Sequence, residues 1–157
     1  MGGLKGLVNQ LWSDRLHWVH SVPATYAAGA HDIFNIIGGP VWIRALLEYN
    51  NTALTGATTT TLAVGVVGLD TGLLAIGPAA INTLVVSPLD AAVAKIAPAL
   101  AVQMPSLLGF ATNIGVVASA GVAINVTFGG VAMGAAERVS YYVCYQRLSP
   151  QSNIVLA

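Results

Sequence analysis

Three histidines come nearest, by residue type and spacing, to forming a metal site in this chain. His17 and His20 lie three residues apart, and His31 follows a loop rich in alanine and glycine. On a helix the first two imidazoles could share a metal ion, with Asp14 or Asp32 as a third ligand. No cysteine cluster accompanies them, and the spacing matches no zinc motif. We therefore expect these histidines to pack at an interface or to face solvent, and we expect no bound metal.

The candidate nucleophiles lack the partners that covalent catalysis requires. Cys144 and Ser149 are the conceivable nucleophiles, but there is no Gly-x-Ser-x-Gly motif and no histidine after His31. Asp70 and Asp90 fall in predicted turns, where a carboxylate caps backbone N–H groups. The glycine-rich stretches lack the Gly-Lys-Ser/Thr ending of a phosphate-binding loop. The sequence thus predicts a protein that is not an enzyme and binds no cofactor.

Arg44 and Glu48 are opposite charges that strand alternation would bring onto a common face. In an uninterrupted strand over residues 41–49, residues four apart lie on the same side, two pleats apart. The two charges could pair along a sheet edge or across a subunit interface, or they could belong to a solvated face. Both interpretations stay open, and we treat Arg44 and Glu48 as a candidate interface charge pair.

The composition excludes several classes of partner. Of 157 residues, 55% are hydrophobic and only 8% are charged, and six basic residues balance six acidic ones. Without a basic stripe to follow a phosphate backbone, nucleic-acid binding is not expected. A transmembrane helix needs about 20 consecutive apolar residues, and the best candidate windows are interrupted by Gly, Pro, Asn or Thr. Near-zero net charge removes the repulsion that keeps monomers soluble, so we expect a homo-oligomer.

The start of the chain does not read as a secretory signal. Its first residues, MGGLKG, contain no apolar run of the required length, and Asp14 and Arg15 follow soon after. We therefore expect a protein made in a cytoplasm and not exported by the usual signal. Cys144 is the single cysteine, so no intrachain disulfide is expected.

Alternating apolar and polar residues predict a chain of short strands. The clearest lies at residues 138–148, where Val139 and every second residue after it form one face and Cys144 lies on the other with Tyr142. Glycine- and proline-rich turns separate it from strands predicted at 32–37, 41–49, 58–67, 115–118 and 122–131, of which the first two and the last two form adjacent pairs. With the further apolar segments at 73–76 and 80–86 the chain has seven or eight short strands, which predict an all-β fold, a β-sandwich or jelly roll.

The first 30 residues read as an extended arm ahead of that sandwich. Apolar residues recur at helical intervals over 4–12, which could form a short amphipathic helix, and residues 15–20 alternate. Exposure-prone tryptophans call for a partner surface, so we expect the arm to be anchored by Leu11, Trp12, Leu16 and Trp18. The predicted organisation is an arm at 1–30, a β-sandwich domain at 31–150 and a C-terminal tail at 151–157.

Three pieces of the chain resemble a group of small β-rich structural proteins of tailed bacteriophages. They are the arm segment LWSDRLHWVHSVPATY (11–26), the strand pair around IFNIIGGPVWI (33–43), and the closing strand ending YQRLSPQSN (145–153). The resemblance implies a capsid cement or decoration protein on the virion surface, assembled in the host cytoplasm. Its partners would be the major capsid protein and further copies of itself, with a trimer favoured. Repeated weak contacts suit such a role because multivalency multiplies modest affinities.

Two alternatives remain beside this interpretation. The protein could be a tail, neck or head-fibre component that binds a host-surface receptor or glycan, which aromatic residues at loop tips would favour. It could also be an integral membrane or pore-forming protein, which the interrupted apolar windows disfavour.

Overall fold

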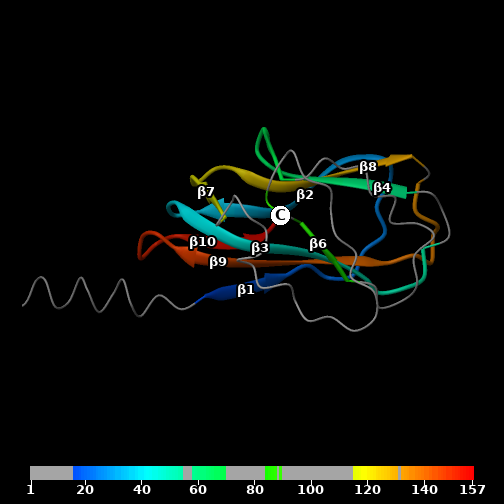
Figure 1. Cartoon of the computed structure of the whole chain (residues 1–157), viewed down its shortest axis with the longest axis horizontal. Coiled ribbons are helices and arrows are strands. Elements are labelled where there is room, and N and C mark those ends of the chain that lie inside the picture. Colours follow the sequence, from blue (N-terminus) through cyan, green and yellow to red (C-terminus); the bar gives the residue numbers. More distant parts are fainter. Residues whose placement is uncertain (1–15, 55–57, 70–83, 88, 90–114, 131) are drawn as a thin grey trace, which may run out of the picture.

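The computed structural model describes residues 16–54, 58–69, 84–87, 89, 115–130 and 132–157. Within these residues the chain forms ten β-strands and no helix (Figure 1). The strands are β1 (His17–His20), β2 (Gly29–Ile37), β3 (Val41–Asn50), β4 (Thr58–Val64), β5 (Val67–Gly68), β6 (Leu84–Val86), β7 (Val116–Ala118), β8 (Ala123–Gly130), β9 (Val139–Arg147) and β10 (Asn153–Leu156).

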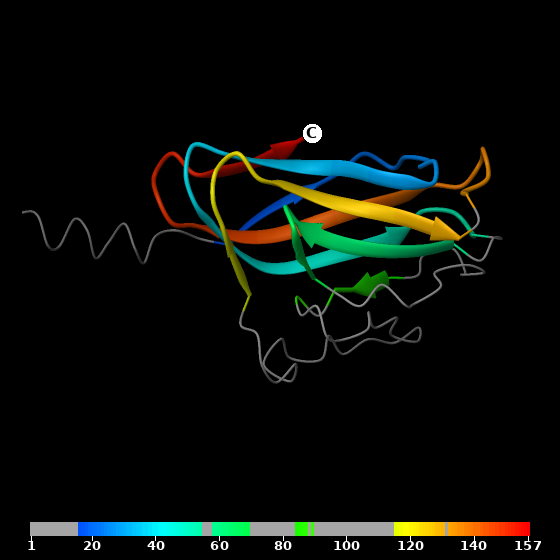
Figure 2. The same cartoon turned by 90° about the horizontal axis from the view of Figure 1, so that it is seen from above.

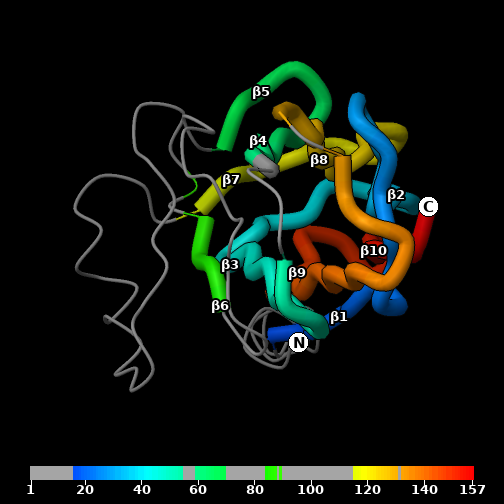
Figure 3. The backbone as a smooth tube through the Cα atoms, turned by 90° about the vertical axis from the view of Figure 1, so that its right-hand side faces the viewer, coloured from blue at the N-terminus to red at the C-terminus, as the bar shows by residue number. Residues whose placement is uncertain are grey.

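The strands form two antiparallel sheets that pack face to face (Figure 2). Sheet A has the order β1-β9-β3-β6, with β7 also paired to β3, and sheet B has the order β10-β2-β8-β4-β5. Seen end-on, β3, β9 and β1 lie on one side of the molecule and β4, β8 and β2 on the other (Figure 3). The prediction of an all-β sandwich is therefore confirmed.

The connectivity of this sandwich is that of a jelly roll. Strands pair as in one long folded hairpin, β1 with β9, β2 with β8, β3 with β7 and β4 with β5. The pairs then alternate between the sheets, and the pairings of β3 with β9 and of β4 with β8 complete the two layers. β10 is an addition to this pattern and extends sheet B beside β2.

Three short connections cross between the sheets at one end, the left-hand end of Figure 1. They join β2 to β3, β7 to β8 and β9 to β10, and they bond to each other: Gly121 N donates to Ile36 O at 2.8 Å and Leu148 N donates to Pro40 O at 3.1 Å. The prediction of adjacent strand pairs across the first two of these turns is therefore wrong. A turn signal marks where a strand ends, but it does not specify whether the next strand stays in the same sheet.

The third predicted strand also ends earlier than expected. β4 stops at Val64 because Gly65, with a φ of +58°, turns the chain and β5 returns beside it. The single strand predicted at 58–67 is therefore divided by a turn at Gly65 and Val66. This hairpin tip is apolar, and the Val66 side chain is fully exposed.

The core fills the space between the sheets with the inward residues of both layers. Alternation buries one face of β4, at Thr60, Leu62 and Val64. The largest fully buried side chains include Tyr141 and Phe34. Each fully buried Leu, Ile or Phe contributes about 1.5–3 kcal/mol relative to exposure. The core members are Ile33, Phe34, Ile36, Val41, Ile43, Leu46, Leu54, Leu62, Val64, Leu69, Val85, Leu89, Ala118, Ile124, Val126, Phe128, Met133, Val139, Tyr141, Val143, Tyr145 and Ile154.

The predicted boundaries at residues 30 and 150 are both wrong. β1 pairs with β9, Ser21 N donates to Tyr141 O at 2.8 Å, and the Tyr26 ring stacks on Phe128 at 4.9 Å between centroids. Residues 16–30 therefore belong to the sandwich and not to an arm. The predicted tail contains β10, which pairs with the full C-terminal half of β2. The helix predicted at 4–12 lies outside the described residues.

Candidate interaction surface

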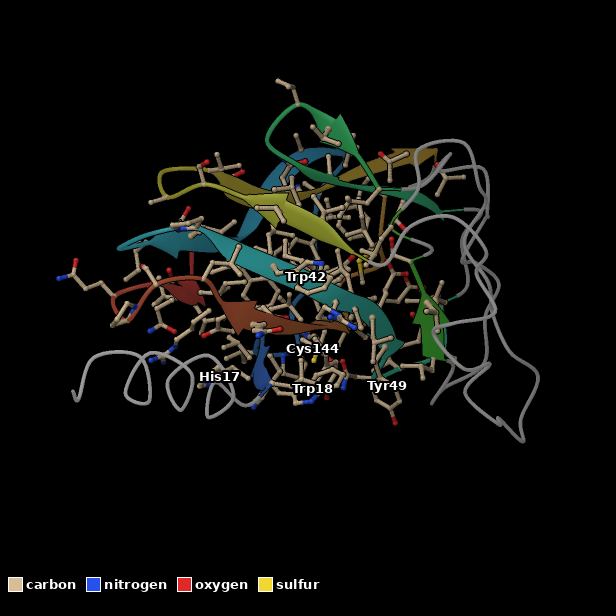
Figure 4. All side chains as sticks on the ribbon, turned by 60° about the vertical axis from the view of Figure 1, so that its left-hand side comes forward. His17, Trp18, Trp42, Tyr49 and Cys144 are labelled. Atoms are coloured by element: carbon tan, nitrogen blue, oxygen red, sulfur yellow. The ribbon has the colours of Figure 1, made fainter. Side chains whose placement is uncertain are left out.

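The outward side of sheet A carries a cluster of aromatic side chains. Because Val143 and Tyr145 of β9 point into the core, their neighbours point out, and the strand register extends this side across β1 and β3. Figure 4 places Trp18, Cys144 and Trp42 in a row across β1, β9 and β3. We call this surface the aromatic face; it comprises Trp18, His20, Trp42, Arg44, Tyr49 and Tyr142.

Ring contacts link the members of the aromatic face across neighbouring strands. His20 of β1 stacks on Tyr142 of β9 with centroids 5.6 Å apart, and Tyr142 meets Tyr49 of β3 edge-on at 6.4 Å. Such pairs contribute about 0.5–1.5 kcal/mol beyond the area that they bury. The surface is therefore partly ordered before any partner binds, which reduces the entropy lost on association.

Arg44 lies over the indole of Trp42. Its Cζ atom is 4.0 Å from the ring centroid, a distance at which the guanidinium is attracted to the π face. Gly115, with a φ of +128°, makes room for this arrangement, since a Cβ there would stand 2.5 Å from Trp42 Nε1 and 2.2 Å from Ile43 O. The Arg44 guanidinium therefore lies over the indole ring of Trp42, which packs closely against Gly115.

The prediction that Arg44 and Glu48 share one face of the strand is wrong. A β-bulge between Ile43 and Ala45 places an extra residue in β3, so Arg44 and Ala45 both lie on the outward side and the later alternation is reversed. Glu48 consequently faces the opposite sheet, where it is fully buried and accepts a hydrogen bond from Thr60 Oγ1 at 2.9 Å. The two charges lie on opposite faces of one strand.

Cys144 lies beneath the centre of the aromatic face. It is opposite Trp18 on one side and Ala45 on the other, on the Tyr142 side of β9 as predicted, and only 3% of its surface is exposed. Burial raises the pKa of its thiol, an effect that the nearby Arg44 guanidinium partly offsets. A buried, protonated thiol is a poor nucleophile, so Cys144 contributes packing to the face.

The other described charges near β9 serve local backbone structure. Glu137 Oε2 accepts a hydrogen bond from Gly134 N at 2.8 Å. Arg138 Nη1 donates to the carbonyl oxygens of Ala135 at 2.8 Å and Glu137 at 2.7 Å. Both side chains thus organise the turn that leads into β9.

The histidines are separated by the fold. Residues three apart on a strand point to opposite faces, so His17 faces inward with its ring 5.4 Å from Tyr145, and His20 faces outward. His31 Nε2 lies 3.0 Å from Ala27 O in the loop before β2. Across the described ranges, no three His, Cys, Asp or Glu side chains are grouped so that they could hold a metal ion.

The outward side of sheet B has a different chemistry. On β4 and β8 it presents small or uncharged residues, and Thr61 lies directly opposite Thr127 with Ala63 opposite Asn125. No aromatic side chain faces outward from these two strands, because Phe128 points into the core. The two faces of the sandwich therefore differ sharply in aromatic content.

Two of the four predicted arm anchors belong to this surface or its edge. Trp18 is 53% exposed within the aromatic face, and Leu16 is 56% exposed just before β1. Leu11 and Trp12 lie outside the described residues. The sequence analysis missed Trp42, Tyr49 and Tyr142. Tyr142 could have been found by listing the aromatic residues opposite the core positions of its strand, but Trp42 and Tyr49 share a face only because of the bulge between Ile43 and Ala45.

No protein-family model, curated protein or solved structure matches this chain. In the part of the chain that the structure describes, no helix has the length and apolar character needed to cross a membrane.

Proposed function

We propose that this chain is a non-enzymatic structural protein of a virion that packs against neighbouring subunits of the capsid through its aromatic face. The observation that carries the proposal is the composition of that face. Among the described outward residues of β1, β3 and β9 there are Trp, Tyr and one Arg, and no Lys, Asp or Glu. Trp, Tyr and Arg dominate the binding energy of protein interfaces, whose centres are depleted of Lys, Asp and Glu.

The fold and the charge balance support the same role. Jelly rolls are recurrent building blocks of viral capsids and lectins, although a fold by itself does not specify a function. Six acidic and six basic residues leave no net charge to keep the chain monomeric by repulsion. Burying a neutral aromatic surface against neighbouring subunits removes the surface most prone to nonspecific aggregation.

A role in receptor binding at loop tips has less support. The described turns after β2, β4, β7 and β9 contain glycine, proline, serine, glutamine and aliphatic residues and no aromatic side chain. Tyr26 is the aromatic residue of the loop before β2, and its partly buried ring is stacked on Phe128. Recognition by exposed aromatic loop residues is therefore not the arrangement that these tips offer.

Cosedimentation with capsids tests the proposal. The full chain is mixed with particles assembled from the major capsid protein of the same virus, and bound protein is measured after pelleting. Trp18→Ala and Tyr142→Ala each remove an aromatic side chain from the face, while Thr61→Ala on the outward side of sheet B is the matched control. We expect the wild type and Thr61→Ala to pellet with the particles, and both aromatic variants to remain in the supernatant.

Circular dichroism establishes that each variant is folded before binding is measured. Equal pelleting of all four proteins would refute the aromatic face as the contact. Failure of the wild type to pellet, together with binding to a glycan array, would instead place the protein among receptor-binding components.

A further inference from the structure

The aromatic face has a matching segment in the chain itself. Residues 4–12 carry Leu4, Leu7, Val8 and Leu11 at helical spacing, which gives one apolar stripe. We propose that the aromatic face binds this N-terminal segment from a second copy of the chain, so that neighbouring subunits are joined by arm exchange. The inference rests on the proposed function and identifies the binding partner of the aromatic face.

The dimensions of the segment and the face agree. Nine residues of helix are about 13 Å long and, with side chains, about 10 Å wide. The face spans three strands, about 10 Å across, and extends about 23 Å along β3 from Trp42 to Tyr49. One short helix therefore covers the centre of the face, where Trp18, Cys144 and Ala45 lie level with each other.

The charges are also complementary. Arg44 is the one formally charged side chain among the described outward residues of β1, β3 and β9. Asp14 is the first acidic residue of the chain and follows directly on the apolar stripe. Two faces packed against each other about a two-fold axis would bring two Arg44 guanidinium groups into one apolar interface without a carboxylate, which is unfavourable. A docked arm brings Asp14 to Arg44 and avoids that repulsion.

The direction of β1 favours a second copy over the same chain. β1 runs in the same direction as β3 and begins level with Ile43, close to the turn between β2 and β3. His17, the first residue of β1, therefore stands near the Trp42 end of the face, and the face extends from there in the direction in which the chain continues, toward Tyr49. A segment that precedes β1 in the sequence reaches the face of its own chain only by reversing this direction, and a segment from a neighbouring copy is free of that constraint.

A complementation experiment tests the exchange with the full chain. The arm variant Leu7→Asp/Leu11→Asp keeps an intact face, and the face variant Tyr142→Asp keeps an intact arm. Sedimentation velocity should show that the wild type self-associates and that each variant alone is monomeric. Mixed in equal amounts, the two variants should form a one-to-one complex, because the intact arm of one binds the intact face of the other.

Exchanging the charges of Asp14 and Arg44 is a second, independent experiment. Asp14→Arg and Arg44→Glu should each weaken self-association about tenfold, and the double variant should regain most of that loss. Circular dichroism confirms that every variant is folded. Thr61→Asp, on the outward side of sheet B, is the control that should associate as the wild type does.

Two results would overturn the exchange: a monomeric wild type, or folded arm and face variants that form no complex on mixing. These results are separate from the capsid test. A monomeric wild type that still pellets with capsids in a manner dependent on Trp18 and Tyr142 would leave the proposed function standing and remove only the arm exchange.

Discussion

Replacing Gly38 with alanine should destabilise the protein far more than the same replacement at Gly121. Both glycines occupy turns at the same end of the sandwich, and both have left-handed backbone conformations, with φ of +72° and +83°. A Cβ at Gly38 would stand 2.0 Å from the backbone oxygen of Gln151, whereas a Cβ at Gly121 would meet nothing within 4 Å. Comparing the two alanine variants therefore separates the cost of backbone strain, which both share, from the cost of the steric conflict, which only Gly38→Ala has.

The expected magnitudes follow from this geometry. A non-glycine residue in the left-handed region costs roughly 1–2 kcal/mol, which applies to both variants. At Gly38 the turn between β9 and β10 must also move by more than 1 Å to restore an ordinary contact with Gln151. That shift disturbs the hydrogen bonds between Ser149 and Ser152, which include an Oγ–Oγ contact of 2.7 Å, and each bond contributes about 0.5–1.5 kcal/mol. We expect about 1 kcal/mol for Gly121→Ala and about 3 kcal/mol for Gly38→Ala.

Urea unfolding followed by tryptophan fluorescence measures both free energies. Thermal unfolding gives a second estimate, with the melting temperature falling by about 2–4 °C per kcal/mol in a chain of this size. Equal destabilisation of the two variants would refute the close packing of the β2–β3 turn against the β9–β10 turn. It would also weaken the description of this end of the sandwich as an interlocked set of crossings between the sheets.

Three further predictions concern buried groups. Thr60→Val should lower the free energy of unfolding by about 2 kcal/mol because it removes a hydrogen bond to the buried carboxylate of Glu48; in urea unfolding the outward control Thr61→Val should change it little. Since burial raises the pKa of the Cys144 thiol, a chromogenic disulfide reagent should react with it much more slowly in the native protein than in urea, and equal rates would contradict its burial. Burial also raises the pKa of the Tyr26 phenol, so the stability that this group contributes is complete below about pH 10 and is lost as the pH rises through the folded-state value. Tyr26→Phe should therefore lose less stability than the wild type between about pH 9 and pH 11 in denaturant titrations, and identical losses would exclude Tyr26 as the source.

Local alternation in the sequence determined which residues share a face in the strands that run without a bulge. In β9, the period of two correctly separated Val139 and its partners from Cys144. This prediction succeeds because side-chain direction along a strand depends on the adjacent residues of the same strand.

The candidate surface required the tertiary structure. The alternation of residues 41–49 gave no sign of the bulge at Arg44, since a bulge arises from how two strands fit together and is not a property of one strand. That single extra residue places Arg44 on Trp42 and encloses Glu48 between the sheets. The aromatic face likewise exists only because β1 and β3 are held on either side of β9.

The sequence alone also left undetermined which of the two sheets each strand joins. The glycine-rich turn at 38–40 signals a change of direction whether the next strand pairs with the last one or crosses to the opposite sheet. Residues 16–30 of the predicted arm and the predicted tail at 151–157 belong to the sandwich as strands and packed loops, because β1 pairs with β9 and β10 pairs with β2. β1 and β9, like β2 and β10, are more than 100 residues apart in the sequence and pair only when the whole sandwich closes. The alternation of short segments therefore determined where strands form. Only the assembled sheets determined which strands lie side by side.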